Sequence, residues 1–513
     1  MNLQLTQSSL SSHEGAALSS GDMTRSAFWV GMSLILCAFV ARVFSHFDYT
    51  PDDTFIYLQY ARNVLGSHEV SFNPGEPSYG ITGPLWLALV SGAGLLGFDL
   101  YLAAKVIDLV VGCAAIVALA RLQNALLSNR MVAFATAAVF STHVWFLRWA
   151  GTGMEASLAT LLSVLTLHCL MKQQYHLGAV YSALLTLTRP EAMGLVAIGM
   201  LSSILVAGEG LEKVKKVAVF AAGYLVILLP WYLYAYTHFG TIVPNTALAK
   251  SSSGMSFEGI ISTVVDIGKT LAVSDGIEVL ILLFVLGTFF FHHVRGKREV
   301  ENGKQFLVPL SWIVGLPLLY VVTLTNVVSR YLLVISPMIL MLAFGSLVML
   351  QRLKGKEHLS RKLTLGLALV LIVQNIILFE VQVRPHLDAF AEGMHNGFIK
   401  IGQWLHENTS QDDAVLVADI GAIGYFSERK ICDAAGLVSP ELLPLSRMGY
   451  SIERIMREPV FASRCNARYV VERSDVPNAV HPVDLQPVFA VAINGLGLSS
   501  QDTAYYTVFR VRR

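Results

Sequence analysis

The stretch that decides the fold class runs from Ser26 to Phe44 and reads SAFWVGMSLILCAFVARVF. A helix that crosses a bilayer needs about 20 consecutive, mainly apolar residues. This run meets that length in a chain that is 54% hydrophobic and only 14% charged, whereas soluble domains carry about 25% charged residues. No small-residue cleavage site follows Phe44, so the run is predicted to be an uncleaved signal anchor of a membrane protein.

Similar apolar runs follow along the chain and predict about eleven membrane-spanning helices. They lie near 27–45, 82–97, 101–120, 131–149, 155–171, 177–207, 214–237, 276–294, 305–325, 330–350 and 362–384. The run at 177–207 is too long for one simple span and is interrupted by Thr188-Arg189-Pro190-Glu191. Because proline breaks or kinks a helix, this run is either one kinked helix or two short ones.

Basic residues mark the cytoplasmic loops of membrane proteins. They gather at 209–216, 292–304 and 351–362, which predicts that the loops 46–81 and 238–275 and the region 385–513 lie on the outer face. The Ser-rich residues 1–26 are then a disordered cytoplasmic tail. The same count places Arg121 and Arg130 outside, against the rule, so the orientation of 121–176 stays open.

The composition changes after residue 384. Helix-like and strand-like runs alternate through 385–513, which predicts an extracytoplasmic α/β domain with its own core. Cys432 and Cys465 fall in this domain and can form a disulfide if it lies outside the cytoplasm. The formal net charge of +1 and the lack of a basic arm argue against nucleic-acid binding. The fold class is therefore mainly α, a polytopic membrane domain over 27–384 with this domain attached.

Pro51-Asp52-Asp53, soon after the first span, is the sharpest candidate site. Two adjacent carboxylates can bind a divalent cation, or one can act as a general base. The same residues also suit the first turn of a helix, where acidic side chains are stabilised by the helix dipole. The two roles are compatible, since one Asp can cap the helix while its neighbour takes part in chemistry.

Charged residues within apolar runs are costly in lipid and usually line a cavity or form pairs. Arg189, next to Pro190, is placed to bind a phosphate through its guanidinium. Structural pairs of Arg189 with Glu191, or of Arg148 with Glu155, explain these residues equally well. Lys105 and Asp108 are spaced three apart and predict a pair on one helix face.

The loop 238–275 offers His238, Asn245 and Lys250, whose imidazole, amide and ammonium groups suit sugar or phosphate. The first outer loop ends in Tyr79-Gly80-Ile81-Thr82-Gly83-Pro84-Leu85-Trp86, which is also explained as a turn leading into a span. Asp419, after a short strand and before Gly421 and Gly424, resembles a ligand-binding turn or a structural strand end.

Taken in order, these segments resemble the GT-C superfamily of membrane glycosyltransferases, and most of all the bacterial cell-wall terminal arabinofuranosyltransferases. The matching segments are Pro51-Asp52-Asp53-Thr54-Phe55-Ile56, Phe72-Asn73-Pro74-Gly75-Glu76, Gly80 to Trp86, Gly153-Met154-Glu155, Thr188 to Glu191, Pro244-Asn245-Thr246 with Lys250, Ser329-Arg330-Tyr331 and Asp419 to Tyr425. Two positions depart from the pattern: Gly83 replaces an Asn, and Val327-Val328 replaces a more polar stretch.

The resemblance implies an inverting glycosyltransferase in the bacterial inner membrane, with its active site on the periplasmic side. It implies a polyprenyl-phosphate sugar as donor, arabinofuranose or another pentose as the sugar, and a cell-envelope glycan or glycolipid as acceptor. Asp52 or Asp53 would be the general base, with a divalent cation (Mg, Mn or Ca) bound nearby. Phosphate binding would fall to Arg189, Arg330 and Lys250, and substrate binding to Glu155, Thr82, Trp86, His238 and Asn245.

The main alternative is a polytopic transporter or lipid flippase without transferase activity. Broken helices and charged residues within the membrane fit that class as well. It predicts internal pseudo-symmetry among the spans, which the sequence does not show. It gives no reason for paired carboxylates in the first outer loop.

Overall fold

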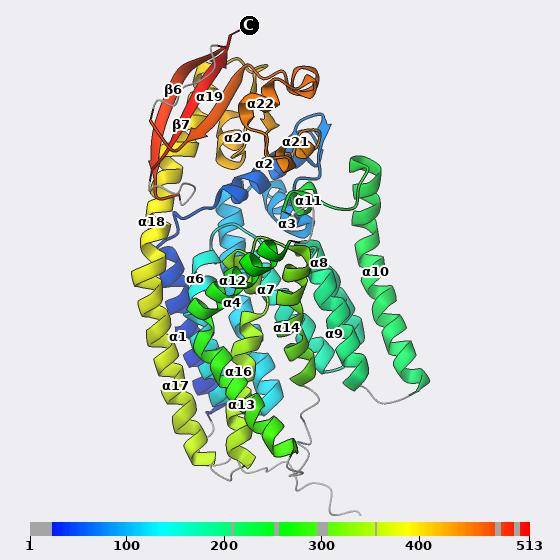
Figure 1. Cartoon of the computed structure of the whole chain (residues 1–513). Helices are drawn as coiled ribbons and strands as arrows, with labels where there is room; N and C mark the ends of the chain where they lie inside the picture. The colour runs from blue at the N-terminus through cyan, green and yellow to red at the C-terminus, as the bar shows by residue number, and fades with distance from the viewer. Residues whose placement is uncertain are drawn as a thin grey trace, which may run out of the picture.

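The computed structural model describes residues 23–206, 210–250, 256–294, 306–353, 357–477, 484–496 and 503–512. A bundle of long helices carries a small sheet-containing domain at one end (Figure 1). The bundle is formed by α1 (Arg25–Phe44), α4 (Leu100–Leu127), α5 (Arg130–Ser141), α6 (Val144–Trp149), α7 (Ala156–Met171), α8 (Tyr175–Thr188), α9 (Ala192–Val206), α10 (Leu211–Phe239), α12 (Phe257–Ser274), α13 (Gly276–Val294), α14 (Leu307–Thr323), α15 (Ser329–Leu332), α16 (Ser336–Leu353) and α17 (Glu357–Leu378). Most of the tail predicted at 1–26 lies outside the described residues.

The chain is a multi-pass membrane protein. Among the described residues, four helices are long and apolar enough to cross a membrane, namely Arg25–Phe44, Leu100–Leu127, Val214–Phe239 and Lys362–Asn408. A fifth span results if α12 and the first part of α13, which are bent by 97° at a short break, are counted together. Shorter apolar helices of 10–17 residues occur within α3 (Pro84–Leu95), α5, α7, α9, α14 and α16.

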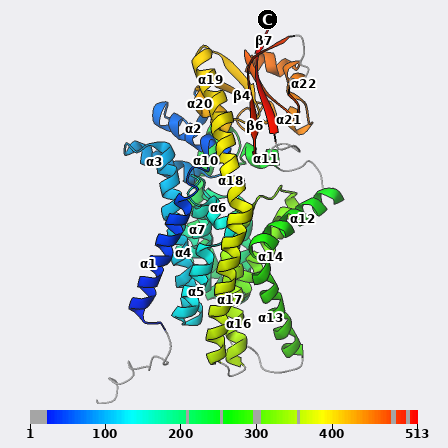
Figure 2. The same ribbon diagram turned by 90° about the vertical axis from the view of Figure 1, so that its left-hand side faces the viewer.

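The predicted spans 131–149 and 330–350 are each divided into two helices, α5 with α6 and α15 with α16, and two further runs differ more strongly from the prediction. The run at 82–97 forms α3 (Pro84–Leu95), which has 12 residues and lies beside α2 (Asp52–Gly66) at the upper end of the bundle (Figure 2). The run at 177–207 forms two helices, α8 and α9, on either side of the Arg189-Pro190 break. Arg189 breaks the helix because its extended backbone, at φ −145° and ψ 113°, is what a residue before proline prefers.

These two differences resolve the orientation of 121–176. The Arg130 guanidinium donates to the Met23 carbonyl at 3.3 Å, and the Arg121 guanidinium lies 5.7 Å from the ring centre of Trp29. Arg121 and Arg130 therefore lie where α1 begins, at the end of the bundle predicted to be cytoplasmic. The count misplaced them because it treated α3 as a span and α8 and α9 as one.

Small residues allow α9 and α14 to approach closely. A methyl group at Gly199 would lie 2.6 Å from the Trp312 indole nitrogen, and one at Gly315 would lie 2.5 Å from Ile198. Close approach of backbones is how helices gain packing energy in lipid, where the hydrophobic effect does not drive their association. The tight pair forms one side of the cavity described below.

The C-terminal domain is joined to the bundle by one long helical segment, visible in yellow in Figure 1. It continues from α17 through η2 (Phe379–Val383), α18 (Arg384–Gly393), η3 (Met394–Ile399) and α19 (Lys400–Asn408). The domain then forms β3 (Ala414–Val417), α20 (Gly421–Ser427), β4 (Lys430–Asp433), α21 (Leu443–Arg447), α22 (Ile452–Met456), η4 (Phe461–Cys465), β5 (Tyr469–Ser474), β6 (Leu485–Asn494) and β7 (Thr503–Val511). The strand order is β4-β3-β5-β7-β6. The first three strands are parallel, and β7 and β6 are antiparallel additions.

The domain docks onto the first outer loop through the edge of its sheet. This loop contains α2 and the small hairpin of β1 (Ser71–Asn73) and β2 (Glu76–Pro77). The Asn73 amide donates to the Ile431 carbonyl at 2.8 Å and accepts from the Ile431 N–H at 2.9 Å. It thus satisfies both backbone groups of one residue on edge strand β4, which would otherwise be open to pairing. Lys430 also forms an ion pair with Glu76.

A disulfide joins Cys432 on β4 to Cys465 at the end of η4 and closes a loop of 33 positions. A cross-link over a loop of this length typically stabilises a fold by about 2–4 kcal/mol, in part by restricting the unfolded chain. We expect a Cys432→Ser, Cys465→Ser double variant to lose stability by that amount. This loss of stability would be measured by thermal unfolding, with chemical labelling of residues that are buried in the folded domain as the readout. An equal loss in a Cys113→Ser control, which removes a cysteine of the bundle, would contradict the prediction.

Candidate active site

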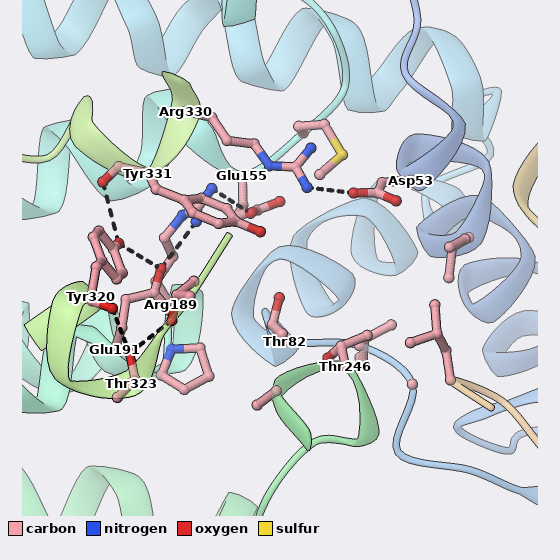
Figure 3. A pocket seen from close by; sticks show the side chains of 18 of the residues that line it. Asp53, Thr82, Glu155, Arg189, Glu191, Thr246, Tyr320, Thr323, Arg330 and Tyr331 are labelled. Carbon is pink, nitrogen blue, oxygen red and sulfur yellow. Dashed lines mark hydrogen bonds and ion pairs between the residues drawn. The ribbon is translucent and has the colours of Figure 1, made fainter. Parts of the chain in front are cut away.

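A cavity of about 420 Å³ lies where the bundle, the first outer loop and the C-terminal domain meet. Charged and polar side chains from four separate segments face it (Figure 3). Those segments are the start of α2, the turn before α7, the break between α8 and α9, and α15 with the end of α14. The residues are Asp53, Glu155, Arg189, Glu191, Tyr320, Thr323, Arg330 and Tyr331, joined on the opposite side by Thr82 and Thr246.

Arg189 is the centre of a buried ion-pair network. Its guanidinium lies 3.0 Å from a Glu155 carboxylate oxygen and 3.1 Å from a Glu191 carboxylate oxygen. The side chains of Arg189 and Glu155 are only 5% and 3% exposed. The sequence suggested pairs of Arg189 with Glu191 and of Arg148 with Glu155; the structure forms the first, and Arg189 takes the place of Arg148 in the second. Arg148 lies instead among the rings of Tyr49, Trp145 and Trp149.

Arg330, on α15, forms an ion pair with Asp53. The Arg330 side chain is 9% exposed, and its guanidinium lies 5.1 Å from the ring centre of Trp149 and 5.5 Å from that of Tyr331. Asp53 is much more open, at 42% exposed. The cavity therefore presents an accessible carboxylate held against a buried cation.

The two arginines keep unused hydrogen-bond donors. Among the described residues, the buried Nε–H groups of Arg189 and Arg330 have no acceptor. A buried donor without a partner costs about 1–3 kcal/mol, so such groups are usually satisfied by a ligand or water. Guanidinium groups bind phosphate through parallel N–H···O bonds. Each of these arginines therefore keeps one N–H group beyond those used in its ion pairs with Glu155, Glu191 or Asp53.

Asp52 has a different environment from Asp53. Its carboxylate accepts from the Gly421 N–H at 2.9 Å and from the Ala422 N–H at 2.8 Å. It does not line the cavity but ties α2 to the start of α20. A methyl group at Gly421 would lie 2.1 Å from the Asp52 carbonyl oxygen, so only glycine permits this approach.

The buried environment of the Asp52 carboxyl predicts that the stability of the fold depends on pH. Desolvation raises the pKa of its carboxyl from 3.8 to about 7, although the N–H bonds from Ala422 and Gly421 oppose the shift. An acid whose pKa is higher in the folded chain stabilises the fold when protonated, and this contribution is lost as pH rises through the folded value. We expect the thermal midpoint in detergent to fall between about pH 5 and pH 8, with a smaller fall in Asp52→Asn. An equal fall in both proteins would contradict the prediction.

Helix α4 positions two of the segments that face the cavity. Lys105 donates to the Thr50 hydroxyl at 2.8 Å and to the Tyr49 carbonyl at 3.1 Å, just before the Asp pair. Asp108 accepts from the N–H groups of Thr152 at 2.9 Å and Gly153 at 3.3 Å, just before Glu155. The predicted pairing of Lys105 with Asp108 is replaced by hydrogen bonds to two different loops.

The remaining predicted residues are divided between the cavity and its surroundings. Thr82 lines the cavity, whereas Trp86 is fully buried and donates to the Gly153 carbonyl at 3.0 Å. Asn245, at the start of α11 (Asn245–Lys250), donates to the Leu437 carbonyl at 3.0 Å. His238 is exposed, stacks on Tyr234 and does not line the cavity. The side chain of Lys250 lies outside the described residues.

Several cavity residues were not among the predicted site residues. Tyr57, Tyr320, Thr246 and Leu437 line it together with Tyr331, which the sequence only flagged as a neighbour of Arg330. Tyr320 donates to Glu191 at 3.4 Å. Leu437 belongs to the C-terminal domain, on the loop after β4. Its backbone N–H donates to Asp433 at 2.5 Å, and the N–H of Val438 does so at 3.0 Å. Thr246 and Tyr331 belong to segments that match the superfamily, but no motif marks Tyr57, Tyr320 or Leu437, which reach the site through tertiary packing alone.

The divalent cation expected at Asp52 and Asp53 was tested against the donors that these residues offer. The Asp52 oxygens already accept two backbone N–H groups, and Asp53 faces the Arg330 cation. Within the described residues, no group of three or more His, Cys, Asp or Glu side chains is arranged to bind a metal. The donor set does not fit a divalent cation well.

A family model matches the C-terminal domain of the chain. Residues 381–509 match the family model described as Domain of unknown function (DUF8728). No curated protein matches the chain in sequence.

Solved structures are similar to nearly the whole chain. The apo oligosaccharyltransferase of Archaeoglobus fulgidus has a TM-score of 0.57 at 13% identity, covering 88% of this chain and 70% of that one. The apo ArnT of Cupriavidus metallidurans has a TM-score of 0.60 at 12% identity, covering 88% and 93%. Arabinofuranosyltransferase AftD from mycobacteria has a TM-score of 0.52 at 17% identity, covering 96% of this chain but 40% of AftD.

These structures are membrane glycosyltransferases of the GT-C class. The chain therefore has the GT-C fold, and the predicted resemblance to this superfamily is confirmed at the level of the fold. Sequence identities of this size do not extend to the reaction or its substrates.

Proposed function

We propose that the protein is a glycosyltransferase that moves a sugar from a polyprenyl-phosphate donor to a hydroxyl of a cell-envelope acceptor. The observation that carries the proposal is the pair of buried guanidinium groups, Arg189 and Arg330, with unused donors beside the accessible carboxylate of Asp53. Two cations suit the phosphate of the donor, and the carboxylate suits the acceptor hydroxyl. Catalysis of this kind needs both groups within reach of one reacting carbon.

Asp53 is the general base in this proposal, because it lines the cavity and Asp52 does not. It takes the proton of the acceptor hydroxyl while the hydroxyl oxygen bonds to the anomeric carbon. The bond from that carbon to the phosphate oxygen breaks, and the polyprenyl phosphate leaves with the bonding electrons. Attack from the face opposite the leaving group inverts the anomeric centre. Arg189 and Arg330 stabilise the charge that develops on the phosphate.

Arg330 has a second role that follows from its contact with Asp53. The two side chains form an ion pair, and a cation beside a carboxylate makes it a weaker base. An arriving phosphate competes with Asp53 for the Arg330 guanidinium. Asp53 then regains basicity only when the donor is bound, which restricts proton abstraction to the occupied site.

The walls of the cavity suggest how the donor lies. Gly194 on α9 and Leu319 on α14 line the end that faces the bundle, which suits the lipid chain. Thr246 on α11 and Leu437 of the C-terminal domain line the other end, which leaves that end for the acceptor. The C-terminal domain therefore contributes to the substrate-binding surface.

Features of other GT-C structures are consistent with a lipid-phosphate donor. ArnT from Cupriavidus metallidurans has been solved bound to undecaprenyl phosphate, and the archaeal oligosaccharyltransferase AglB with a dolichol-phosphate and an inhibitory peptide. The similarity to AftD makes arabinofuranose or another pentose the first sugar to test. The Cys432–Cys465 disulfide supports a location of the domain outside the cytoplasm, and so a periplasmic active site in the bacterial inner membrane.

The test is sugar transfer by purified protein in nanodiscs, with a panel of polyprenyl-phosphate sugars and a cell-envelope glycan extract, with and without EDTA. We expect sugar transfer from one of the donors. The comparison with and without EDTA tests separately whether transfer requires a divalent cation. Binding of polyprenyl phosphate alone should also be measured, since it does not require the acceptor. A folded protein that neither binds polyprenyl phosphate nor transfers sugar would overturn the proposal and favour the transporter alternative.

A further inference from the structure

A second cavity of about 570 Å³ lies in the membrane bundle, away from the candidate active site. It is a groove between α1, α4, α7 and α8. Its polar end is formed by Arg121 near the end of α4, His168 near the end of α7 and Gln174 just before α8. Because Arg121 lies beside Trp29 of α1, this end is the one at which α1 begins.

The groove is graded from polar to apolar along its length. Beyond Arg121 it is walled by Val117 and Ala114 of α4 and by Leu165 and Leu161 of α7. From Arg121 back to Cys113, the helix rise of 1.5 Å per residue gives a depth of about 12 Å. A polar mouth at the membrane surface with an apolar interior matches a lipid, whose head is polar and whose chain is not.

The charged side chains at the polar end of the groove, called its mouth here, are all basic. Helices α1, α7 and α8 contain no Asp or Glu, and the only acid of α4 is Asp108, at the opposite end. The cations here are Arg121, which lines the mouth, and the exposed Lys172 on the turn after α7, and the His168 imidazole in the mouth offers a hydrogen bond. A basic pocket between helices at a membrane surface attracts anionic lipid head groups, worth about 1 kcal/mol for each cation near the surface.

We propose that this groove is a binding site for one anionic phospholipid of the leaflet on the side of the basic loops. One acyl chain lies between α4 and α7, and the phosphate is bound by Arg121 and His168. The site is independent of sugar transfer: Arg121 lies about 24 Å along α4 from Lys105, which contacts the first outer loop beside the active site. The ligand is therefore a structural lipid and not the donor.

The test uses the full chain in detergent, titrated with phosphatidylglycerol or with phosphatidylethanolamine of the same acyl chains, with bound lipids counted by native mass spectrometry. We expect one phosphatidylglycerol to bind first, about fivefold or more tighter than phosphatidylethanolamine. Arg121→Gln should reduce this preference about fivefold, since it removes one cation. The Arg121 side chain is exposed, so the variant should fold.

Two further variants make the test specific. Lys362→Gln removes an exposed cation on α17, outside the groove, and should leave the preference unchanged. Ala114→Trp fills the apolar part of the groove from an exposed position and should weaken binding of both lipids without lowering the thermal midpoint. The proposal is overturned if the wild-type protein binds both lipids equally. It is also overturned if Lys362→Gln acts like Arg121→Gln, or if Ala114→Trp has no effect.

Discussion

Asp53→Asn is expected to abolish sugar transfer while leaving the protein folded and able to bind the donor. A positioned general base contributes about 10²–10⁴ in rate, and the amide cannot accept the proton. Asn at this position also no longer forms an ion pair with Arg330. The guanidinium is then more available to phosphate, so polyprenyl phosphate should bind as tightly as before or more tightly. Transfer in saturating donor and lipid binding by the same preparation measure the two effects separately.

Two matched variants accompany Asp53→Asn. Asp48→Asn makes the same chemical change at an exposed position shortly before α2, and should leave transfer unchanged. Asp52→Asn weakens the contact with Gly421 and Ala422, so it should lower stability and activity together and by less. Full activity in Asp53→Asn would remove it as the base. Full loss in Asp52→Asn with normal stability would move that role to Asp52.

Arg189→Gln is expected to cause the second large loss, and to cause it in two ways. It leaves the Glu155 carboxylate, which is 3% exposed, without its cation. Breaking a buried ion pair by removing one partner costs about 3–5 kcal/mol, so the thermal midpoint should fall strongly. It also removes one of the two guanidinium groups that face the donor phosphate, so transfer should be lost.

The double variant Arg189→Gln, Glu155→Gln separates these two effects. The second change removes the buried carboxylate of Glu155, and the Glu191 carboxylate that also loses its partner is 26% exposed, so most of the stability should return. Transfer and binding of polyprenyl phosphate should not return, because the phosphate still lacks its cation. Arg148→Gln is the control, since that guanidinium lies among aromatic rings near the site but does not line the cavity. Activity recovered in the double variant would show that Arg189 serves the fold alone.

The sequence was sufficient to predict the membrane bundle, the separate C-terminal domain and the polar residues that matter most. Charge in an apolar run is rare enough that Arg189, Glu155 and Arg330 stand out without a structure. The Asp pair stands out because it follows the first span directly. These patterns involve neighbouring residues only, so they can be detected in a single sequence.

What the sequence did not predict depends on contacts between distant segments. The different environments of Asp52 and Asp53 are set by α20 and α15, both of which lie far from the Asp pair in the sequence. The spacing of Lys105 and Asp108 suggests a pair, but each side chain reaches a different loop. The direction of the helices between 100 and 206 depended on α3, whose composition suits a span although it has only 12 residues.

The contact of Asp52 with Gly421 joins residues that are 369 positions apart in the chain. At a synthesis rate of about 5–20 residues per second, roughly 20 to 70 seconds separate the appearance of the two residues. During that interval the membrane helices can already insert, but the wall that contains Leu437 does not yet exist. The cavity beside Asp53 is therefore completed only late in synthesis, after all the membrane helices have been made.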